Sequence, residues 1–272
     1  MILRKMLDKR SKMLRRLVLE MVKVGGRGHI GPSLSLIEIL RVLYDSFLRF
    51  RPDQPEWSKR DRLILSKGHG CLALYALLAD KGFFERSELK RFCLPESILG
   101  GHPERNKVPG VEASTGALGH GLAIGVGMAL ASKIRKQSHR IVVVTGDGEI
   151  NEGSIWESAM SASKHQLNNL SIFIDYNKLQ SYGPVEEVLG LEPLVDKWQS
   201  FGFEVQEVDG HDTKDLHDLI VKLPFHSDRP STIICHTIKG KGLPFAENNP
   251  EWHHKSGLKA KEIKAMYDCL EY

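Results

Sequence analysis

The segment from Val142 to Glu157, VVVTGDGEINEGSIWE, places acidic side chains directly after a run of β-branched residues. Asp147 stands in the Gly-Asp-Gly turn that follows this run, and Asn177 stands at the end of the next apolar run, IDYNKLQ. If the two runs are neighbouring parallel strands joined by a helix, both side chains reach the same edge of the sheet. Carboxylate, amide and carbonyl oxygens suit a hard divalent cation that keeps phosphate oxygens in its shell. The spacing therefore predicts a metal site formed by Asp147, Asn177 and the Leu179 carbonyl, with Gly148 allowing close approach of a phosphate.

Taken alone, Gly-Asp-Gly is first of all a turn signal, so the surrounding elements must support the metal interpretation. Apolar runs without strict alternation predict strands that are covered on both faces, as in a parallel sheet; these runs span 62–66, 140–146, 170–176, 203–210 and 231–237. Helical patterns lie between them, over 34–48, 71–81, 118–135, 155–165, 194–201 and 216–223. Alternating strands and helices predict an α/β fold, a doubly wound, mostly parallel sheet with helices on both faces.

Two further helix signals lie in the N-terminal part of the chain. Ser35 and Glu38 have the spacing of a capping box at the start of a helix. A basic N-terminal segment is expected to form a docked surface helix that stops at Gly25-Gly26, because one apolar stripe runs through Leu3, Leu7, Leu14, Leu17, Val18 and Met21.

Composition excludes several functional classes. The chain has 272 residues, of which 26% are charged, and a net charge of +4 with no basic block, so nucleic-acid binding is not expected. No apolar run approaches the roughly 18 residues of a membrane span, so no membrane association is expected. Four widely spaced cysteines without a CxxC motif indicate a reducing compartment, and the cytoplasm is the predicted location. We found no repeat or linker, which predicts one domain over 1–272.

The wider sequence context resembles transketolase. The Gly-Asp-Gly turn followed after 28 residues by Asn177 is similar to the thiamine diphosphate signature, and further segments are similar to transketolases in the same order. These segments include GHIGPSLS, DRLILSKGHG, GGHPE, VPGVEASTGALGHG, LEPLVDKWQSFGFEVQEVDGHD and HTIKGKGLPFAENNPEWH. The resemblance as a whole extends from about residue 10 to the C-terminus. The resemblance implies thiamine diphosphate and Mg²⁺ (or Ca²⁺) as cofactors, with Asp147, Asn177 and the Leu179 carbonyl as the metal ligands.

The resemblance also assigns roles to four histidines in Gly-rich or Pro-flanked loops, His29, His69, His102 and His253. It implies that His69 and His253 contact the cofactor, with His253 also near the reacting oxygens. It implies that His29 and His102 contact hydroxyl groups of the sugar. Imidazole suits such roles because it donates or accepts a proton near neutral pH. A lone histidine is more often structural, so these roles depend on the resemblance.

Three more positions receive roles by resemblance. Gly116 and Leu118, in STGALGHG, would line the cofactor, and Glu152 would join a carboxylate network at a subunit contact. For Glu152 the alternative is a surface carboxylate in the first turn of a helix.

The chain departs from the family pattern at the rim of the site. These departures replace common family residues near the cofactor, so they concern substrate specificity. They are His120, Ser181, Tyr182 and His254.

The sequence lacks the part of a transketolase that holds the aminopyrimidine ring and supplies its activating glutamate. The resemblance therefore implies the N-terminal, diphosphate-binding subunit of a two-chain transketolase. Such an enzyme transfers a two-carbon ketol unit from a ketose (phosphate) to an aldose (phosphate). The expected assembly contains two copies of this chain and two of a C-terminal subunit.

Two other interpretations stay open at this point. The first is another thiamine diphosphate enzyme subunit, similar to deoxyxylulose-phosphate synthase or to 2-oxo-acid dehydrogenase, although the four histidines favour transketolase. The second is a non-catalytic regulatory module of the same fold. A nicotinamide-dinucleotide enzyme is disfavoured, because no Gly-rich turn follows the first strand with an acid about 20 residues later.

Overall fold

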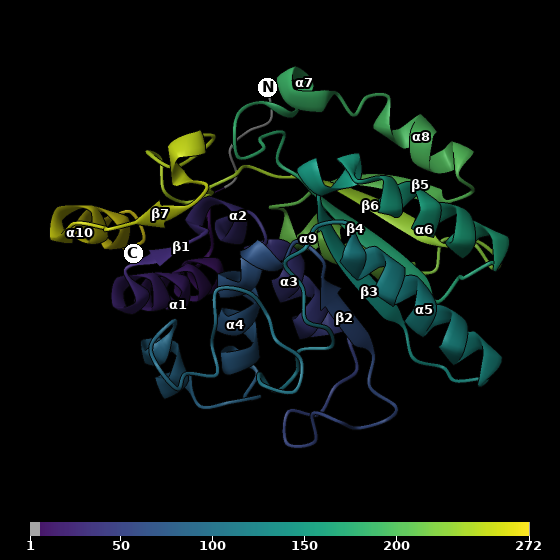
Figure 1. Cartoon of the computed structure of the whole chain (residues 1–272), viewed down its shortest axis with the longest axis horizontal. Coiled ribbons are helices and arrows are strands. Elements are labelled where there is room, and N and C mark those ends of the chain that lie inside the picture. The colour runs from purple at the N-terminus through teal and green to yellow at the C-terminus, as the bar shows by residue number, and fades with distance from the viewer. Residues whose placement is uncertain (1–5, 272) are drawn as a thin grey trace.

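A computed structural model describes residues 6–271 and contains a central parallel sheet (Figure 1). Its strands follow the order β2-β3-β4-β6-β5 and have the bounds β2 (Arg62–Leu65), β3 (Ile141–Gly146), β4 (Leu170–Tyr176), β5 (Glu204–Asp209) and β6 (Ser231–His236). Every neighbouring pair is parallel, and each strand coincides with one of the predicted apolar runs. The predicted doubly wound α/β fold is confirmed.

Successive side chains of the strands enter two different cores, one on each face of the sheet. In β3, Val142 and Val144 belong to one apolar cluster, whereas Ile141 and Val143 belong to the other. The first cluster also contains side chains of α1 (Lys9–Gly25), α3 (Ile37–Val42), α4 (Cys71–Asp80) and α9 (Thr213–Ile220). The second contains side chains of α5 (His120–Ile134), α6 (Gly153–Lys164) and α8 (Leu194–Ser200). Burial on both faces explains why β3, β4 and β6 are largely apolar, whereas β5 at the edge of the sheet exposes Gln206 and Glu207.

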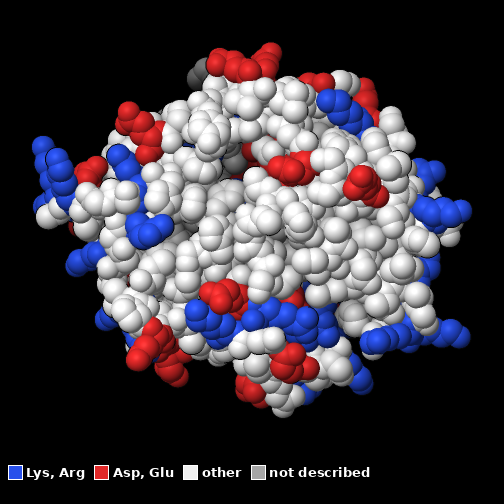
Figure 2. All heavy atoms as spheres, in the orientation of Figure 1, with Lys and Arg blue, Asp and Glu red and all other residues white. Residues whose placement is uncertain are grey.

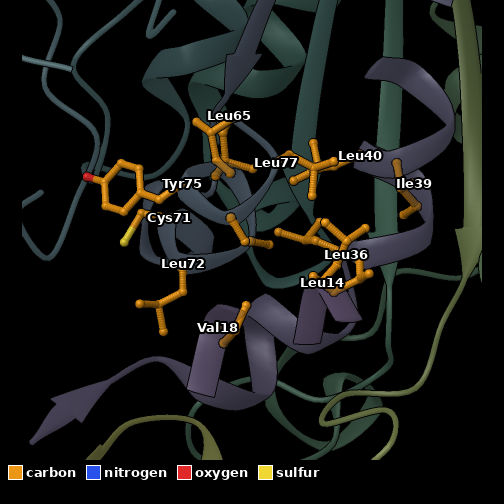
Figure 3. Close-up of a cluster of buried hydrophobic side chains, with 14 of the residues drawn as sticks. Leu14, Val18, Leu36, Ile39, Leu40, Leu65, Cys71, Leu72, Tyr75 and Leu77 are labelled. Carbon is orange, nitrogen blue, oxygen red and sulfur yellow. The ribbon is translucent and has the colours of Figure 1, made fainter. Parts of the chain in front are cut away.

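Helices α1, α3 and α4 meet around a tightly packed part of the first core (Figure 3). Val18 of α1 lies toward Leu72 of α4, and Leu14 of α1 lies beside Leu36, which directly precedes α3. All four side chains are fully buried.

Shorter elements lie around this core. They are β1 (Arg27–Gly28), α2 (Ile30–Leu34), a π-helical turn at Leu43–Phe47, α7 (Val185–Leu189), β7 (Lys255–Ser256), α10 (Ala260–Asp268), and 3₁₀ turns at Gly68–Gly70, Arg86–Arg91, Gly148–Asn151 and Pro250–Trp252. Strands β1 and β7 form an antiparallel pair that the sequence did not predict.

The predicted N-terminal helix is confirmed as α1. Asp8 accepts a hydrogen bond from the Ser11 N–H at its start, and Gly26 ends it in the left-handed conformation with φ 62°. Leu14, Val18 and Met21 of the predicted stripe are buried, while Leu3 lies outside the described residues.

The predicted capping box at Ser35 and Glu38 is wrong. Ser35 has helical backbone angles of φ −69° and ψ −24°, whereas an N-cap needs an extended backbone. Its hydroxyl donates to Asp175 at 2.6 Å, and Glu38 pairs with Arg15 instead. Long-range partners therefore override the local spacing.

Within residues 6–271, no helix combines the length and the apolar character needed to cross a membrane.

Candidate active site at the carboxyl edge of the sheet

The two predicted metal-binding side chains follow neighbouring strands. Gly146 at the end of β3 pairs with Asp175 of β4, so Asp147 and Asn177 emerge at the same edge of the sheet. The residues between them form α6, which returns the chain as expected. The predicted proximity of these two strand ends is confirmed.

Asp147 is buried and held by backbone donors. One carboxylate oxygen accepts from the Gly148 N–H at 2.7 Å, and the other accepts from the Lys178 N–H at 2.6 Å. Burial and the neighbouring carboxylate of Asp175 raise its pKa to about 6, against the opposing charge of Lys67. A cation beside this carboxylate would restore its ionised form.

The neighbouring loop orients the amide of Asn177. Its Oδ1 accepts from the Leu179 N–H at 3.2 Å, and its Nδ2 donates to the Asp175 carbonyl at 3.4 Å. The Leu179 carbonyl, the predicted third ligand, accepts from Lys239 Nζ at 2.6 Å. Burial and the charge of Lys67 lower the pKa of Lys239 to about 8. A cationic group therefore already faces this carbonyl oxygen.

These groups line one cavity of about 260 Å³. It contains every predicted site residue except Glu152, namely His29, His69, His102, Gly116, Leu118, Asp147, Gly148, Asn177, Leu179 and His253. The face shown in Figure 2 is hollowed beside the loops that precede α6. Residues far apart in the chain thus meet at the carboxyl edge of the sheet, as is usual for α/β folds.

The four predicted histidines form one group of rings around His29. Its ring centroid lies 5.3 Å from that of His69, 6.0 Å from that of His102 and 5.5 Å from that of His253. Burial lowers the pKa of His29 to about 4 and that of His253 to about 3. Burial also places the pKa of His69 well below its ordinary value and lowers that of His102. The imidazoles are therefore neutral near pH 7, and each offers one donor and one acceptor.

Two buried lysines were missed by the sequence reasoning, although both stand in Gly-rich segments, SKGHG and IKGKG. Lys67 Nζ donates to Asp175 at 2.5 Å and to the Pro32 carbonyl at 3.3 Å. Lys239 and Lys67 both line the cavity. A lysine beside glycine, shortly after a buried strand, was the available signal, and it indicates an anion-binding loop.

Glu149 was also missed, and it holds three loops of the site together. Its carboxylate accepts from the Ser66 hydroxyl at 2.5 Å, from the Gly119 N–H at 3.0 Å and from the Gly146 N–H at 3.1 Å. Burial raises its pKa. We interpret Glu149 as a positioning residue, because these bonds satisfy backbone groups at the strand ends.

Glycines bring the backbone close to the cavity at two predicted positions. A Cβ added at Gly116, whose φ is 150°, would lie 3.0 Å from the ring of His102. A Cβ added at Gly148 would lie 3.0 Å from Gln180 Cγ. The backbone conformation at Gly116 therefore favours glycine, whereas at Gly148 the flexible Gln180 side chain would have to shift.

The positions that depart from the family pattern have different environments. Ser181 lines the cavity, whereas Tyr182 is 91% exposed. The Nδ1 atom of His120 lies 3.0 Å from the Leu118 carbonyl. His254 packs its ring 4.6 Å from that of His29. At least two of the departures therefore touch the site itself.

Glu152 lies outside the cavity. It is exposed and directly precedes α6, and no side-chain cap hydrogen bond is formed there. The predicted subunit contact remains a prediction.

The chain matches the family model described as "Transketolase, thiamine diphosphate binding domain" over residues 7–272. It is 43% identical over 248 residues to a subunit of the apulose-4-phosphate transketolase of Phocaeicola vulgatus, covering 91% of this chain and 88% of that protein. It is 42% identical to 6-deoxy-6-sulfo-D-fructose transketolase subunit SqwG of Clostridium sp., covering 91% of this chain and 90% of that protein.

Solved transketolases share the fold. The structure of the Campylobacter jejuni transketolase matches with a TM-score of 0.89 at 32% identity, covering 96% of this chain and 42% of that one. The Pichia stipitis enzyme, in complex with sedoheptulose 7-phosphate, matches with a TM-score of 0.87 at 31% identity, covering 95% and 40%. The chain thus spans nearly the whole of the two relatives that are named as subunits, but less than half of these solved chains. On this evidence the chain belongs to the transketolase family and corresponds to its thiamine diphosphate binding domain.

Proposed function

We propose that this chain binds the diphosphate and metal end of thiamine diphosphate and, with a second subunit, transfers a two-carbon ketol unit from a ketose to an aldose. The proposal rests on one observation above all. Asp147 and Asn177, at the ends of adjacent strands, share a cavity with two buried lysines and four neutral imidazoles. This combination of groups suits a metal–diphosphate group together with a polyhydroxylated substrate.

The cavity contains polar atoms without hydrogen-bond partners, and the bound cofactor would supply such partners. Gln180 Nε2 and His253 Nδ1 are buried without a hydrogen-bond partner, and both residues line the cavity. A buried polar atom without a partner costs free energy, so a ligand that supplies partners would be favoured. Gly116 and Gly148 leave room for it beside the backbone.

For the metal we propose Mg²⁺ or Ca²⁺, held by Asp147, Asn177 and the Leu179 carbonyl. The two side chains offer a charged and a neutral oxygen, and the diphosphate would complete the shell. Because Lys239 Nζ already contacts the Leu179 carbonyl, we propose that this lysine moves toward the diphosphate when the metal binds.

The residues of this chain have separable roles in the proposed reaction. When bound, the cofactor supplies an electron sink for cleavage of a carbon–carbon bond. His29 and His102 hydrogen-bond sugar hydroxyls, and His69 and His253 contact the cofactor beside the reacting carbon. Neutral rings are required for these roles, since each must accept as well as donate.

A partner chain would complete the site, and α5 with α6 offers a surface for it. Ile124, Ile134 and Met160 of these helices are 37%, 72% and 57% exposed. Figure 2 shows that most of this face is uncharged, with acidic groups over α6 and other charged groups toward the margin. A broad uncharged face is typical of an interface between subunits, and Glu152 adjoins it before α6.

Relatives that are named as transketolase subunits support a two-chain enzyme. We propose a C-terminal subunit that supplies the activating carboxylate, in an assembly of two copies of each chain. We also propose sugar phosphates or sulfonated sugars as substrates, because the relatives are named for apulose 4-phosphate and 6-deoxy-6-sulfofructose.

Calorimetry tests the proposal. Thiamine diphosphate with Mg²⁺ is titrated into the chain alone and into the complex with its co-purified partner, and ketol transfer is followed in the same samples. Asp147→Ala should abolish metal-dependent binding and turnover, while Asp53→Asn, at an exposed loop position, should change neither. Binding and turnover that survive Asp147→Ala would contradict the metal assignment. Absence of binding by the wild-type complex would instead favour a regulatory module.

A further inference from the structure

A second, smaller cavity of about 80 Å³ adjoins the main one. His29 and His102 line both cavities, so the two cavities adjoin at these residues. The smaller cavity is also lined by Arg27, Cys93 and His254. Arg27 and His254 line only this side cavity, and neither has a place in the proposed function.

The antiparallel pair β1–β7 explains why these side chains converge. Arg27 pairs with Ser256 and Gly28 pairs with Lys255, so His29 lies opposite His254 in the continued register. Since side chains alternate along a strand, Arg27 and His29 share a face with His254. The ring contact of 4.6 Å between His29 and His254 agrees with this arrangement.

The basic groups that line the side cavity have no acidic partner among the other residues of its lining. Within the described residues, no hydrogen bond or ion pair engages the side chains of Arg27 and His254. Besides burial, the neighbours that lower the pKa of His29 are all basic groups, those of His254, His102, Lys67 and Arg27. An anion in the side cavity would therefore meet a free guanidinium fork and an imidazole, without a competing carboxylate.

We infer that Arg27 and His254 form a subsite for the phosphate or sulfonate group of the sugar substrate, so that this chain contributes directly to substrate selectivity. The inference rests on the proposed function and deepens it. A guanidinium recognises a tetrahedral anion through two parallel hydrogen bonds, which a lysine cannot reproduce. The shared rings of His29 and His102 then connect the anion to the site of the sugar hydroxyls.

The kinetic experiment compares charged and neutral donors in the reconstituted two-chain complex. With Arg27→Gln or His254→Asn, the KM for fructose 6-phosphate and for 6-deoxy-6-sulfofructose should rise about 10- to 100-fold, as expected for loss of a charge-assisted hydrogen bond. The KM for fructose should change far less, and kcat should change little. Arg27→Lys should recover only part of the loss. Lys59→Gln, an exposed site before the opposite end of β2, is the matched control.

Comparison of the two charged donors shows which anion the subsite prefers. Equal losses with charged and neutral donors would overturn the inference, because Arg27 would then act on the fold or on all substrates alike.

A direct measurement separates this inference from the proposed function. Binding of inorganic phosphate and of sulfate to the full chain is followed by the ring signals of His254 in NMR spectra, with Arg27→Gln as the comparison. Anion-dependent shifts that Arg27→Gln abolishes support the subsite even if the complex shows no ketol transfer. Shifts that persist in Arg27→Gln, or no shifts in the wild type, overturn it.

Discussion

Replacement of Glu38 by glutamine should strongly destabilise this chain. Glu38 is 1% exposed, and its two carboxylate oxygens accept from Arg15 at 2.6 and 2.9 Å. The ring of His211 lies 2.8 Å from the same carboxylate. Arg15 is fully buried and also donates to three backbone carbonyls, those of Ser11, Leu34 and Lys241. Glutamine would leave the guanidinium buried without a counter-charge.

The expected loss is about 3–5 kcal/mol of unfolding free energy, the usual cost of removing one partner of a buried ion pair. The exposed pair of Lys214 and Asp218 provides the control, since its charges are in water. Asp218→Asn should leave the free energy of unfolding nearly unchanged, because water screens this pair. A double variant, Arg15→Met with Glu38→Met, should cost clearly less than the sum of its single changes, because neither charge is then left alone.

The pH dependence of this loss has a definite sign. The charge of Arg15 and the hydrogen bonds from Arg15 and His211 outweigh burial, and they hold the pKa of Glu38 far below its ordinary value of 4.5. The stabilisation is therefore complete above about pH 4.5, and it decreases as the pH falls below it, by roughly 1.4 kcal/mol per unit, because the unfolded chain binds the proton first.

Urea unfolding followed by circular dichroism at pH 7 and at pH 3.5 measures both effects. The difference between wild type and Glu38→Gln should be larger at pH 7. A difference below about 1 kcal/mol at pH 7, comparable with the surface control, would refute the argument from burial.

Three further predictions concern the cavity. Lys239→Met should weaken thiamine diphosphate binding by the complex about 10- to 100-fold in calorimetry, since a buried ammonium is lost; unchanged affinity would contradict a role at the diphosphate. Gly148→Ala should lower the same affinity about tenfold, because glycine at this position allows close approach of a phosphate. Its Tm should change little, because the new Cβ meets the flexible Gln180 side chain, at 3.0 Å. A large fall in Tm would show that the fold, not the ligand, needs this glycine. The ring of His29 should stay neutral from pH 8 down to about pH 5, because burial lowers its pKa to about 4; an NMR titration midpoint near its ordinary value of 6.5 would contradict that burial.

Strands β3, β4 and β6 were predictable from sequence because burial on both faces leaves a nearly unbroken apolar run. The run that ends at Gly146 and the run that ends at Tyr176 gave the positions of Asp147 and Asn177 directly. No local pattern reveals the partner of Glu38, which lies 23 residues away on another helix. The apparent capping box was a coincidence of spacing, and tertiary packing determined the role of each residue.

The cavity shows the same division between local and long-range signals. Each histidine stands in a Gly-rich or Pro-flanked loop, and this feature marked it as a candidate. Lys239 reaches a carbonyl 60 residues earlier in the chain, and Lys67 reaches a carboxylate 108 residues later. These charged groups come together only in the folded chain, so no local sequence motif indicates their roles.

The electrostatics of the cavity relate these charges to the proposed ligand. Burial disfavours the charged forms of both Asp147 and Lys239, raising the pKa of the first to about 6 and lowering that of the second to about 8. A divalent cation alone would stabilise the charged Asp147 but oppose the ammonium of Lys239, and a diphosphate alone would do the reverse. Bound together, the two ions favour the charged form of both side chains at once. In the proposed function, therefore, the metal and the diphosphate each improve the binding of the other, and the arrangement selects a metal–diphosphate complex over either ion alone.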